Sequence, residues 1–394
     1  MNEGRRPGLR INLATEARST RQRNCEEYTR LEGEFAQANS WHWRECPAWL
    51  KKDVSLLAQF ISAEALQKDL LALDQNQGSD ALRELMDDRI VDESYIADLV
   101  KQAEDDIARK ETALAEKHTV AGSVEVATIA DEVENWDDDT TPHDYHNPTH
   151  DRQVVQRLVK LIRVSEPPLT QQMARVLLMA AAHHDDEHPS GPALVREDLS
   201  YEQISVVVAD ELAVKRGMNI YERTMLATTI LGTTFADKIH PTNHVELMLK
   251  LADIGGYMES NEEWIKQSLD VPKEAVRACV RGIISKAEIP PYMKAWLDQP
   301  DFESARAAWL VGQQNFISYE LRPNHNTYKN RYLSRDDWEI DSYLDEKERL
   351  VQALQGKTSA APDMSIAEMT RINETIDRRL LQIWEKYRSL PEVA

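Results

Sequence analysis

Histidine and aspartate side chains are concentrated in the middle of the chain, where their spacing is suited to metal-dependent hydrolysis. Eight of the 11 histidines lie between His143 and His244. A single histidine in an apolar helix is usually a hydrogen-bonded structural residue, but this clustering favours a metal site. Three segments carry the candidates: HDYHNPTHDRQVV, AAAHHDDEHPSGP and LKLADIGGY. Within them the candidate residues are His146, His150, His184, Asp185, His188 and Asp253.

The first segment places His146 and His150 four residues apart. In a helix, this spacing puts both imidazoles on one face, roughly 6 Å apart at the backbone. One ring could then bind a metal ion while the other contacts the substrate.

The second segment contains the doublet His184-Asp185, which follows the apolar run MARVLLMAAA. Adjacent helical residues normally diverge, so this pair acts as a joint ligand only at a helix end or a kink. Burying the carboxylate without a metal ion or another partner would cost several kcal/mol. We therefore expect the helix to end here and to deliver both side chains into one cavity.

The third segment contains Asp253, which follows another apolar helical run. The pair Gly255-Gly256 is expected to end that helix and open the backbone. Two imidazoles and two carboxylates suit zinc, manganese or iron(II), and a bridging carboxylate lets magnesium bind beside them. Two such ions lower the pKa of a bridging water and clamp phosphate oxygens, which is the chemistry of phosphoester hydrolysis.

Together these motifs resemble those of the HD-domain superfamily of metal-dependent phosphohydrolases, and most closely the class I cyclic-nucleotide phosphodiesterases. That family's Tyr-His-Asn-x-x-His stands here as Tyr145–His150, and its Ala-Asp-Leu/Ile-Ser as Ala252–Gly255. Its His-Asp-x-x-His-Pro-Gly stands as His184–Pro189, with Gly191 one place late. Its purine-binding Gln-x-x-Phe stands as Gln313–Phe316.

The resemblance implies two divalent metal ions. His150, His184, Asp185 and Asp253 would hold a tightly bound ion of zinc, manganese or iron. Asp185 would bridge to a second ion, magnesium or manganese, whose other ligands would be mostly water.

The resemblance also implies roles in catalysis and substrate binding. His146 would be the general acid that protonates the leaving 3′ oxygen. His188 would orient the second ion's waters or the phosphate, and Tyr145 would brace the site. Gln313 would hydrogen-bond the base edge while Phe316, three residues later on the same helix face, stacks on the base.

The positions at which the chain differs from the family's pattern are not those expected to bind the first metal ion. Where the family has Glu-Asn-His-His, this chain has Val208-Ala209-Asp210-Glu211, so only Asp210 or Glu211 could bond waters around the second ion. Thr234 and Gly256 stand where the family has Asp and Asn, on the nucleotide side of the pocket. The metal ligands are thus better preserved than the substrate contacts.

Composition and net charge limit which substrates and which cellular compartment we expect. With 394 residues, 42% of them hydrophobic, the chain can bury a large core. A formal net charge of -21 disfavours long DNA or RNA and leaves a small nucleotide as the partner. Cys25, Cys46 and Cys279 lack paired spacing, which is typical of a reducing compartment. Without a membrane-spanning run or a signal-peptide core, we expect a cytoplasmic protein that does not bind membranes.

Apolar residues recur at intervals of three and four, and glycine is sparse, so we expect an all-α protein. Its catalytic domain would be HD-domain/phosphodiesterase-like, with helical N- and C-terminal extensions. We divide the chain into a flexible Arg-rich segment at 1–24, a helical region at 25–118, the catalytic domain at 119–322 and a helical extension at 323–394.

Within the extensions, three segments are expected to be helical: 79–118, 337–354 and 364–390. The first has an apolar stripe that includes Ile96, Val100, Ala103 and Ile107. Fewer than four clean heptads are present, so packing on the catalytic domain is favoured over a coiled-coil arm. A homodimer formed through such an arm is the alternative.

Three functions fit the sequence. The favoured one is a phosphodiesterase that hydrolyses a cyclic nucleotide to a 5′-nucleotide by means of a metal-bridged hydroxide. The second is an HD-type phosphomonoesterase or nucleotide pyrophosphohydrolase, for which the altered substrate positions leave room. The third is a catalytically dead pseudo-enzyme that binds a nucleotide, although a complete ligand set would be unusual there.

Overall fold

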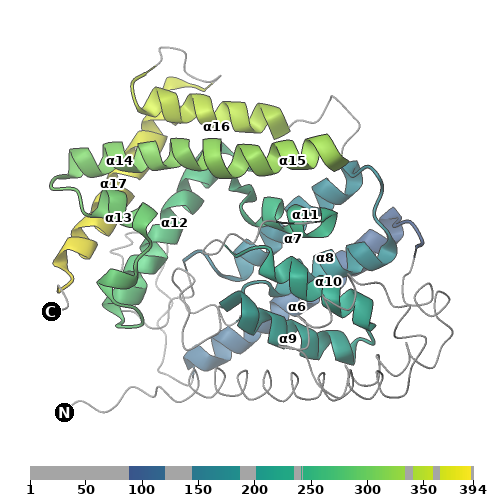
Figure 1. The fold of residues 1–394 in the computed structure, drawn as a ribbon. Coiled ribbons are helices and arrows are strands. Elements are labelled where there is room, and N and C mark those ends of the chain that lie inside the picture. Colours follow the sequence, from purple (N-terminus) through teal and green to yellow (C-terminus); the bar gives the residue numbers. More distant parts are fainter. Residues whose placement is uncertain are drawn as a thin grey trace, which may run out of the picture. The chain divides into compact units, whose positions relative to one another are not determined.

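A computed structural model describes residues 88–119, 144–186, 201–234, 241, 243–332, 340–357 and 364–391 (Figure 1). The regular elements in these ranges are helices, and the single antiparallel bridge, Ile90 with Thr170, is isolated. The prediction of an all-α fold is therefore confirmed for the described part of the chain. None of the helices described there is long and apolar enough to span a bilayer.

The chain divides into two compact units, each discontinuous in sequence. The first comprises Met1–Glu104, Leu158–His188 and Ala193–Lys250; the second comprises Asp105–Arg157, Pro189–Pro192 and Leu251–Ala394. Three helices contribute residues to both units: α6 (Glu93–Thr119), α7 (Pro148–Val164) and α11 (His244–Asp253).

In the first unit, α8 (Gln171–His183), α9 (Tyr201–Lys215) and α10 (Ile220–Leu231) pack against one another. Helix α8 is buried over most of its length, and its run of small residues at 180–182 permits close helix contacts. Side-chain caps define where two of these helices begin: Thr170 accepts from Met173 N–H, and Asn219 forms a capping box with Glu222.

The second unit contains most of the remaining helices. They are η1 (Gly255–Met258), α12 (Asn261–Val280), η2 (Lys286–Glu288), α13 (Pro291–Leu297), α14 (Phe302–Phe316), η3 (Ile317–Leu321), α15 (Arg322–Tyr332), α16 (Ile340–Leu354) and α17 (Ile366–Ser389). A π-helical turn, η3, joins α14 to α15, which continue in line in Figure 1. Helix α16 packs on α14, and α17 packs on α12 and α14.

The expected helices of the extensions are found with shifted boundaries. Helices α16 and α17 lie inside the ranges predicted for them. Helix α6 begins at Glu93, so the described residues 88–92 of the predicted helix are not helical. Its buried stripe runs through Ile96, Leu99 and Ala103, with Leu99 in place of the expected Val100. The prediction for residues 1–24 and the part of the predicted helical region 25–118 that precedes residue 88 lie outside the described residues.

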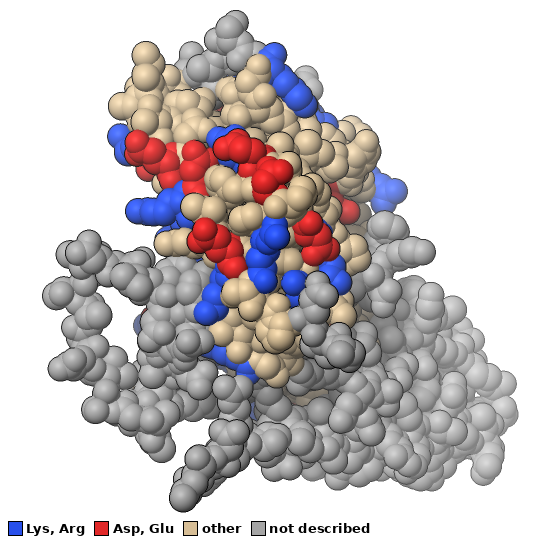
Figure 2. Space-filling model, turned by 90° about the vertical axis from the view of Figure 1, so that its left-hand side faces the viewer, with Lys and Arg blue, Asp and Glu red and all other residues tan. Residues whose placement is uncertain are grey.

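Figure 2 shows one face of the molecule, on which Lys and Arg side chains are interspersed with Asp and Glu. Over the described part of that face, neither sign of charge forms an unbroken patch. Long nucleic acid is bound through a continuous basic surface. The described part of this face shows no continuous basic surface of that kind.

Candidate metal centre

The first histidine motif lies across the start of α7 rather than inside it. Residues 144–147 form a bend, and the helix begins at Pro148. Asn147 caps it, because its side-chain oxygen accepts hydrogen bonds from the N–H groups of Thr149 and His150. The expectation that His146 and His150 share one helix face is thus wrong for His146. Their rings nevertheless lie 6.2 Å apart between centroids.

Tyr145 contacts both histidines and the third motif. Its ring centroid lies 4.4 Å from that of His150 and 5.0 Å from that of His146. Its hydroxyl donates to the main-chain oxygen of Asp253 across 3.4 Å. These contacts are what a residue that braces the site would make.

Glu274, on α12, holds His146 in place. Its Oε2 accepts from the backbone N–H of Tyr145 at 2.7 Å and of His146 at 3.1 Å, while Oε1 lies 2.6 Å from His146 Nδ1. The Glu274 side chain is only 1% exposed, against 19% for His146. A carboxylate this close makes Nδ1 the donor, so Nε2 is the nitrogen that could exchange a proton with a substrate.

The neighbouring Asp144 anchors the same segment to α12. Its carboxylate forms ion pairs with Lys273 and Arg277, each at 3.0 Å. Burial raises the pKa of Asp144, and the two cations oppose that rise. Lys273, Glu274 and Arg277 therefore hold three consecutive residues, Asp144 to His146, against a single helix.

The doublet His184-Asp185 lies at a helix end, as its sequence predicts. Helix α8 ends at His183, and residues 184–186 form a turn. His184 Nε2 lies 3.1 Å from Asp185 Oδ2, and the His184 side chain is 1% exposed. His184 Nδ1 lies 3.0 Å from the main-chain oxygen of Ala181, which can only accept a hydrogen bond. Nδ1 is therefore a donor, and when the ring is neutral its Nε2 lone pair faces Asp185.

His150 and Asp253 form a second contact between an imidazole Nε2 and a carboxylate oxygen. Helix α11 ends at Asp253, as predicted, and is followed by the 3-10 turn η1. His150 Nε2 lies 3.1 Å from Asp253 Oδ1, and the histidine side chain is 3% exposed. Each imidazole of the predicted ligand set thus has a carboxylate oxygen beside its Nε2.

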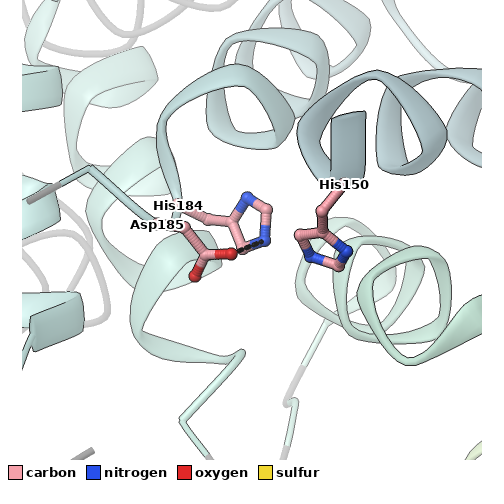
Figure 3. Close-up of side chains that lie close together, drawn as sticks. All are labelled: His150, His184 and Asp185. Atoms are coloured by element: carbon pink, nitrogen blue, oxygen red, sulfur yellow. Dashed lines mark ion pairs between the residues drawn. The ribbon is translucent and has the colours of Figure 1, made fainter. Parts of the chain in front are cut away.

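Figure 3 shows His150, His184 and Asp185 with their polar ends turned toward one another. One ligand atom from each lies within 4.8 Å of the others. Around a tetrahedral zinc ion with ligand bonds near 2.0–2.2 Å, neighbouring ligand atoms are roughly 3.3 Å apart. The two 3.1 Å contacts, each between an imidazole Nε2 and a carboxylate oxygen, match this separation. The chemistry of His150, His184 and Asp185 therefore fits a transition-metal ion, whereas Asp253, the fourth predicted ligand, contacts His150 but is not part of this group.

The second metal site has less support. His188 lies outside the described residues. Asp210 is 2% exposed, and its two carboxylate oxygens accept from Arg223 Nε and Nη2 at 2.7 and 2.9 Å. The structure thus gives Asp210 a structural partner on α10, and Glu211 is exposed.

The predicted base-binding residues, Gln313 and Phe316, lie on the last turn of α14 and are partly exposed. The π-helical turn η3 begins directly after Phe316. Such turns recur at functional sites. The adjacent Gln314 donates to Glu348 on α16 across 3.2 Å. The pairing of Gln313 and Phe316 with a base stays a prediction.

Comparison with known proteins gives no assignment. No family model, no curated protein and no solved structure matches this chain. The geometry of the residues themselves therefore carries the functional argument.

Proposed function

We propose that this protein is a metal-dependent phosphodiesterase of the HD type, in which His150, His184, Asp185 and Asp253 bind one transition-metal ion. The observation that carries the proposal is the environment of His184. The oxygen of Ala181 fixes a proton on Nδ1, so a neutral ring would bring its Nε2 lone pair to 3.1 Å from an oxygen lone pair of Asp185. Such a contact needs a positive charge, either an additional proton or a metal ion, and the approach of His150 to the same atoms favours a metal ion.

A second divalent ion, magnesium or manganese, would share Asp185. One carboxylate oxygen of Asp185 faces His184, and the other points away from it (Figure 3). A carboxylate can bridge two ions in this way. When bound, the two ions supply a hydroxide nucleophile near neutral pH and offset the charge of the phosphate.

The residues of the chain supply proton transfer. As the P–O3′ bond breaks, His146 Nε2 donates its proton to the departing 3′ oxygen, and the ring keeps its Nδ1–H bond to Glu274. Glu274 stabilises the protonated ring before the transfer and holds its orientation throughout. Tyr145, whose ring contacts both imidazoles, keeps His146 at a fixed distance from His150.

We propose a small cyclic nucleotide as the substrate, hydrolysed to its 5′-nucleotide in the cytoplasm. The net charge of -21 opposes binding of long polyanions, while bound cations would attract a single phosphodiester. Gln313 and Phe316 are the proposed base contacts. A phosphomonoester or nucleoside triphosphate substrate is the competing outcome, which the assay below distinguishes.

The test compares hydrolysis of cyclic mononucleotides, phosphomonoesters, nucleoside triphosphates and an aryl phosphodiester by wild type, Asp185→Asn and Asp186→Asn. Asp186 is the matched control, since it adjoins Asp185 but bonds His183 at 2.6 Å. We expect manganese- or magnesium-dependent diester hydrolysis that falls by several orders of magnitude in Asp185→Asn and largely persists in Asp186→Asn. Full activity after exhaustive chelation, or in Asp185→Asn, would contradict the proposal.

A further inference from the structure

Arg157 is a fully buried cation close to the proposed metal ligands. It lies on α7, seven residues after His150 and so on the same helix face, and its side chain is 0% exposed. A buried guanidinium is strongly unfavourable unless its charge and its N–H groups have partners. The identity of those partners indicates what this residue does.

Among the described residues, the hydrogen-bond partners of Arg157 belong to the segment that carries Asp253 or to the helix that follows. Nη1 donates to the main-chain oxygens of Ala252 at 3.0 Å and Asp253 at 3.5 Å. Nε donates to Glu259 Oε1 at 3.0 Å, and Nη2 to Gln267 Oε1 at 3.1 Å. Arg157 thus bonds the backbone of Asp253 and leaves its carboxylate directed at His150.

The two glycines of the motif make room for this arrangement. A Cβ at Gly255 would lie 2.8 Å from Arg157 Cδ, and a Cβ at Gly256 would lie 2.6 Å from Gln267 Oε1. Neither glycine has a positive φ. Close approach of buried side chains, rather than an unusual backbone conformation, therefore explains the pair.

A second buried cation links this turn to the C-terminal extension. Lys347, on α16, is 1% exposed. Its Nζ donates to the main-chain oxygen of Glu259 at 2.9 Å and to Asn261 Oδ1 at 2.8 Å. Glu259 thus accepts from Arg157 through its side chain and from Lys347 through its backbone.

We propose that Arg157 and Lys347 are positioning residues that fix the Asp253 turn for metal binding, so that helix α16 of the C-terminal extension contributes to metal affinity. This inference rests on the proposed metal site. A positive guanidinium at the C-terminal end of α11 also offsets the partial negative charge of its carbonyls. Residues that orient metal ligands in this indirect way typically change affinity 10- to 100-fold when replaced.

The experiment measures the dissociation constant for zinc, by chelator competition, and the visible spectrum of the cobalt-loaded protein. The variants are Arg157→Met, Lys347→Met and Gly255→Ala, with Arg223→Met as the control. Arg223 is equally buried and pairs with a carboxylate, but its partner is Asp210 on α9. We expect affinity to fall about 10- to 100-fold in the three variants, with an altered cobalt spectrum, and to stay within about twofold in the control.

His150→Ala and Asp253→Ala distinguish a failure of the proposed metal site from a failure of the positioning inference. If these replacements leave zinc affinity unchanged, the proposed metal site itself is wrong. If they abolish binding while the positioning variants bind zinc as wild type does, the site stands and the positioning inference is overturned. An equal loss in Arg223→Met would also overturn it, because general destabilisation would then explain the effect. Should Arg157→Met not fold, Gly255→Ala and Lys347→Met test the same inference.

Discussion

At the scale of single residues, the central distinction is between an imidazole that binds metal and one that moves a proton. The environments of His184 and His146 differ in that respect. His184 donates Nδ1–H to a main-chain oxygen and turns Nε2 toward a carboxylate, whereas His146 donates Nδ1–H to buried Glu274 and is 19% exposed. A carboxylate partner stabilises the protonated ring, which suits a proton donor.

Replacement of His146 or Glu274 is therefore expected to affect proton delivery and not metal binding. His146→Ala should retain the metal ion and lower kcat about 10²- to 10⁴-fold on a diester with a poor leaving group. Glu274→Gln should cause a smaller loss of the same kind. An aryl diester with an activated leaving group, which needs no proton, should be far less affected. Equal losses on both substrates, or loss of metal, would assign His146 a different role.

Phe316 gives a second test at this scale. If its ring stacks on the base, Phe316→Ala should raise KM for a purine cyclic nucleotide about fivefold, which corresponds to roughly 1 kcal/mol of stacking. Turnover at saturation should change little, since the phosphate contacts stay. Tyr319, which is 75% exposed, provides a control position on the adjoining π-helical turn. An unchanged KM in Phe316→Ala would remove this residue from the base pocket.

At the scale of elements, the ends of helices matter more than their interiors. The proposed ligands His184, Asp185 and Asp253 lie at or directly after the ends of α8 and α11, and His150 lies in the first turn of α7. Side chains at helix ends can converge, whereas neighbours within a helix diverge around its axis. The packed helices thus place polar groups at their ends while their apolar faces form the core.

The contact of α15 with α16 predicts a pH dependence of stability. His325, on α15, is 1% exposed, and burial lowers its pKa from 6.5 to about 4, although Asp341 opposes that shift. The folded state therefore binds this proton less readily than the unfolded state. The stability from neutral His325 is complete above pH 6.5 and is lost as the pH falls from 6.5 toward 4.

At pH 5 the loss should be on the order of 2 kcal/mol relative to pH 7. His325→Gln should lower stability at pH 7 but show a smaller further decrease at pH 5. The measurement is denaturant unfolding of both proteins at pH 7 and pH 5. Chelator is present so that metal release does not contribute to the change in stability. The titration of the other histidines affects both proteins equally and cancels in the comparison. Equal decreases for wild type and His325→Gln would show that His325 does not carry this dependence.

At the scale of the whole molecule, the sequence predicts the helical class and the ends of two site-bearing helices correctly. Apolar runs that stop at His183 and Asp253 are strong local signals of helix ends. The position of His146 outside α7 could also have been predicted, because a residue before proline disfavours helical backbone and Pro148 suits a first helical position.

Other features depend on contacts between residues distant in sequence, which no local pattern marks. Glu274 lies 128 residues from His146, and Lys347 lies 88 residues from Glu259. Asp210 illustrates the same limit. The resemblance to the phosphodiesterase motifs suggests a role near the second metal ion, but Asp210 pairs with Arg223 on the adjacent helix. Hydrophobic periodicity predicts which faces are buried, but not which charged residues are paired inside.

The most direct test of the proposed metal centre is an anomalous difference map from crystals of the zinc- or manganese-loaded protein, recorded at the absorption edge of the metal. We predict a strong peak about 2.0–2.2 Å from Nε2 of His150, Nε2 of His184 and one carboxylate oxygen each of Asp185 and Asp253. A map with no peak at these residues, and with His184 Nε2 bonded only to Asp185, would contradict the account.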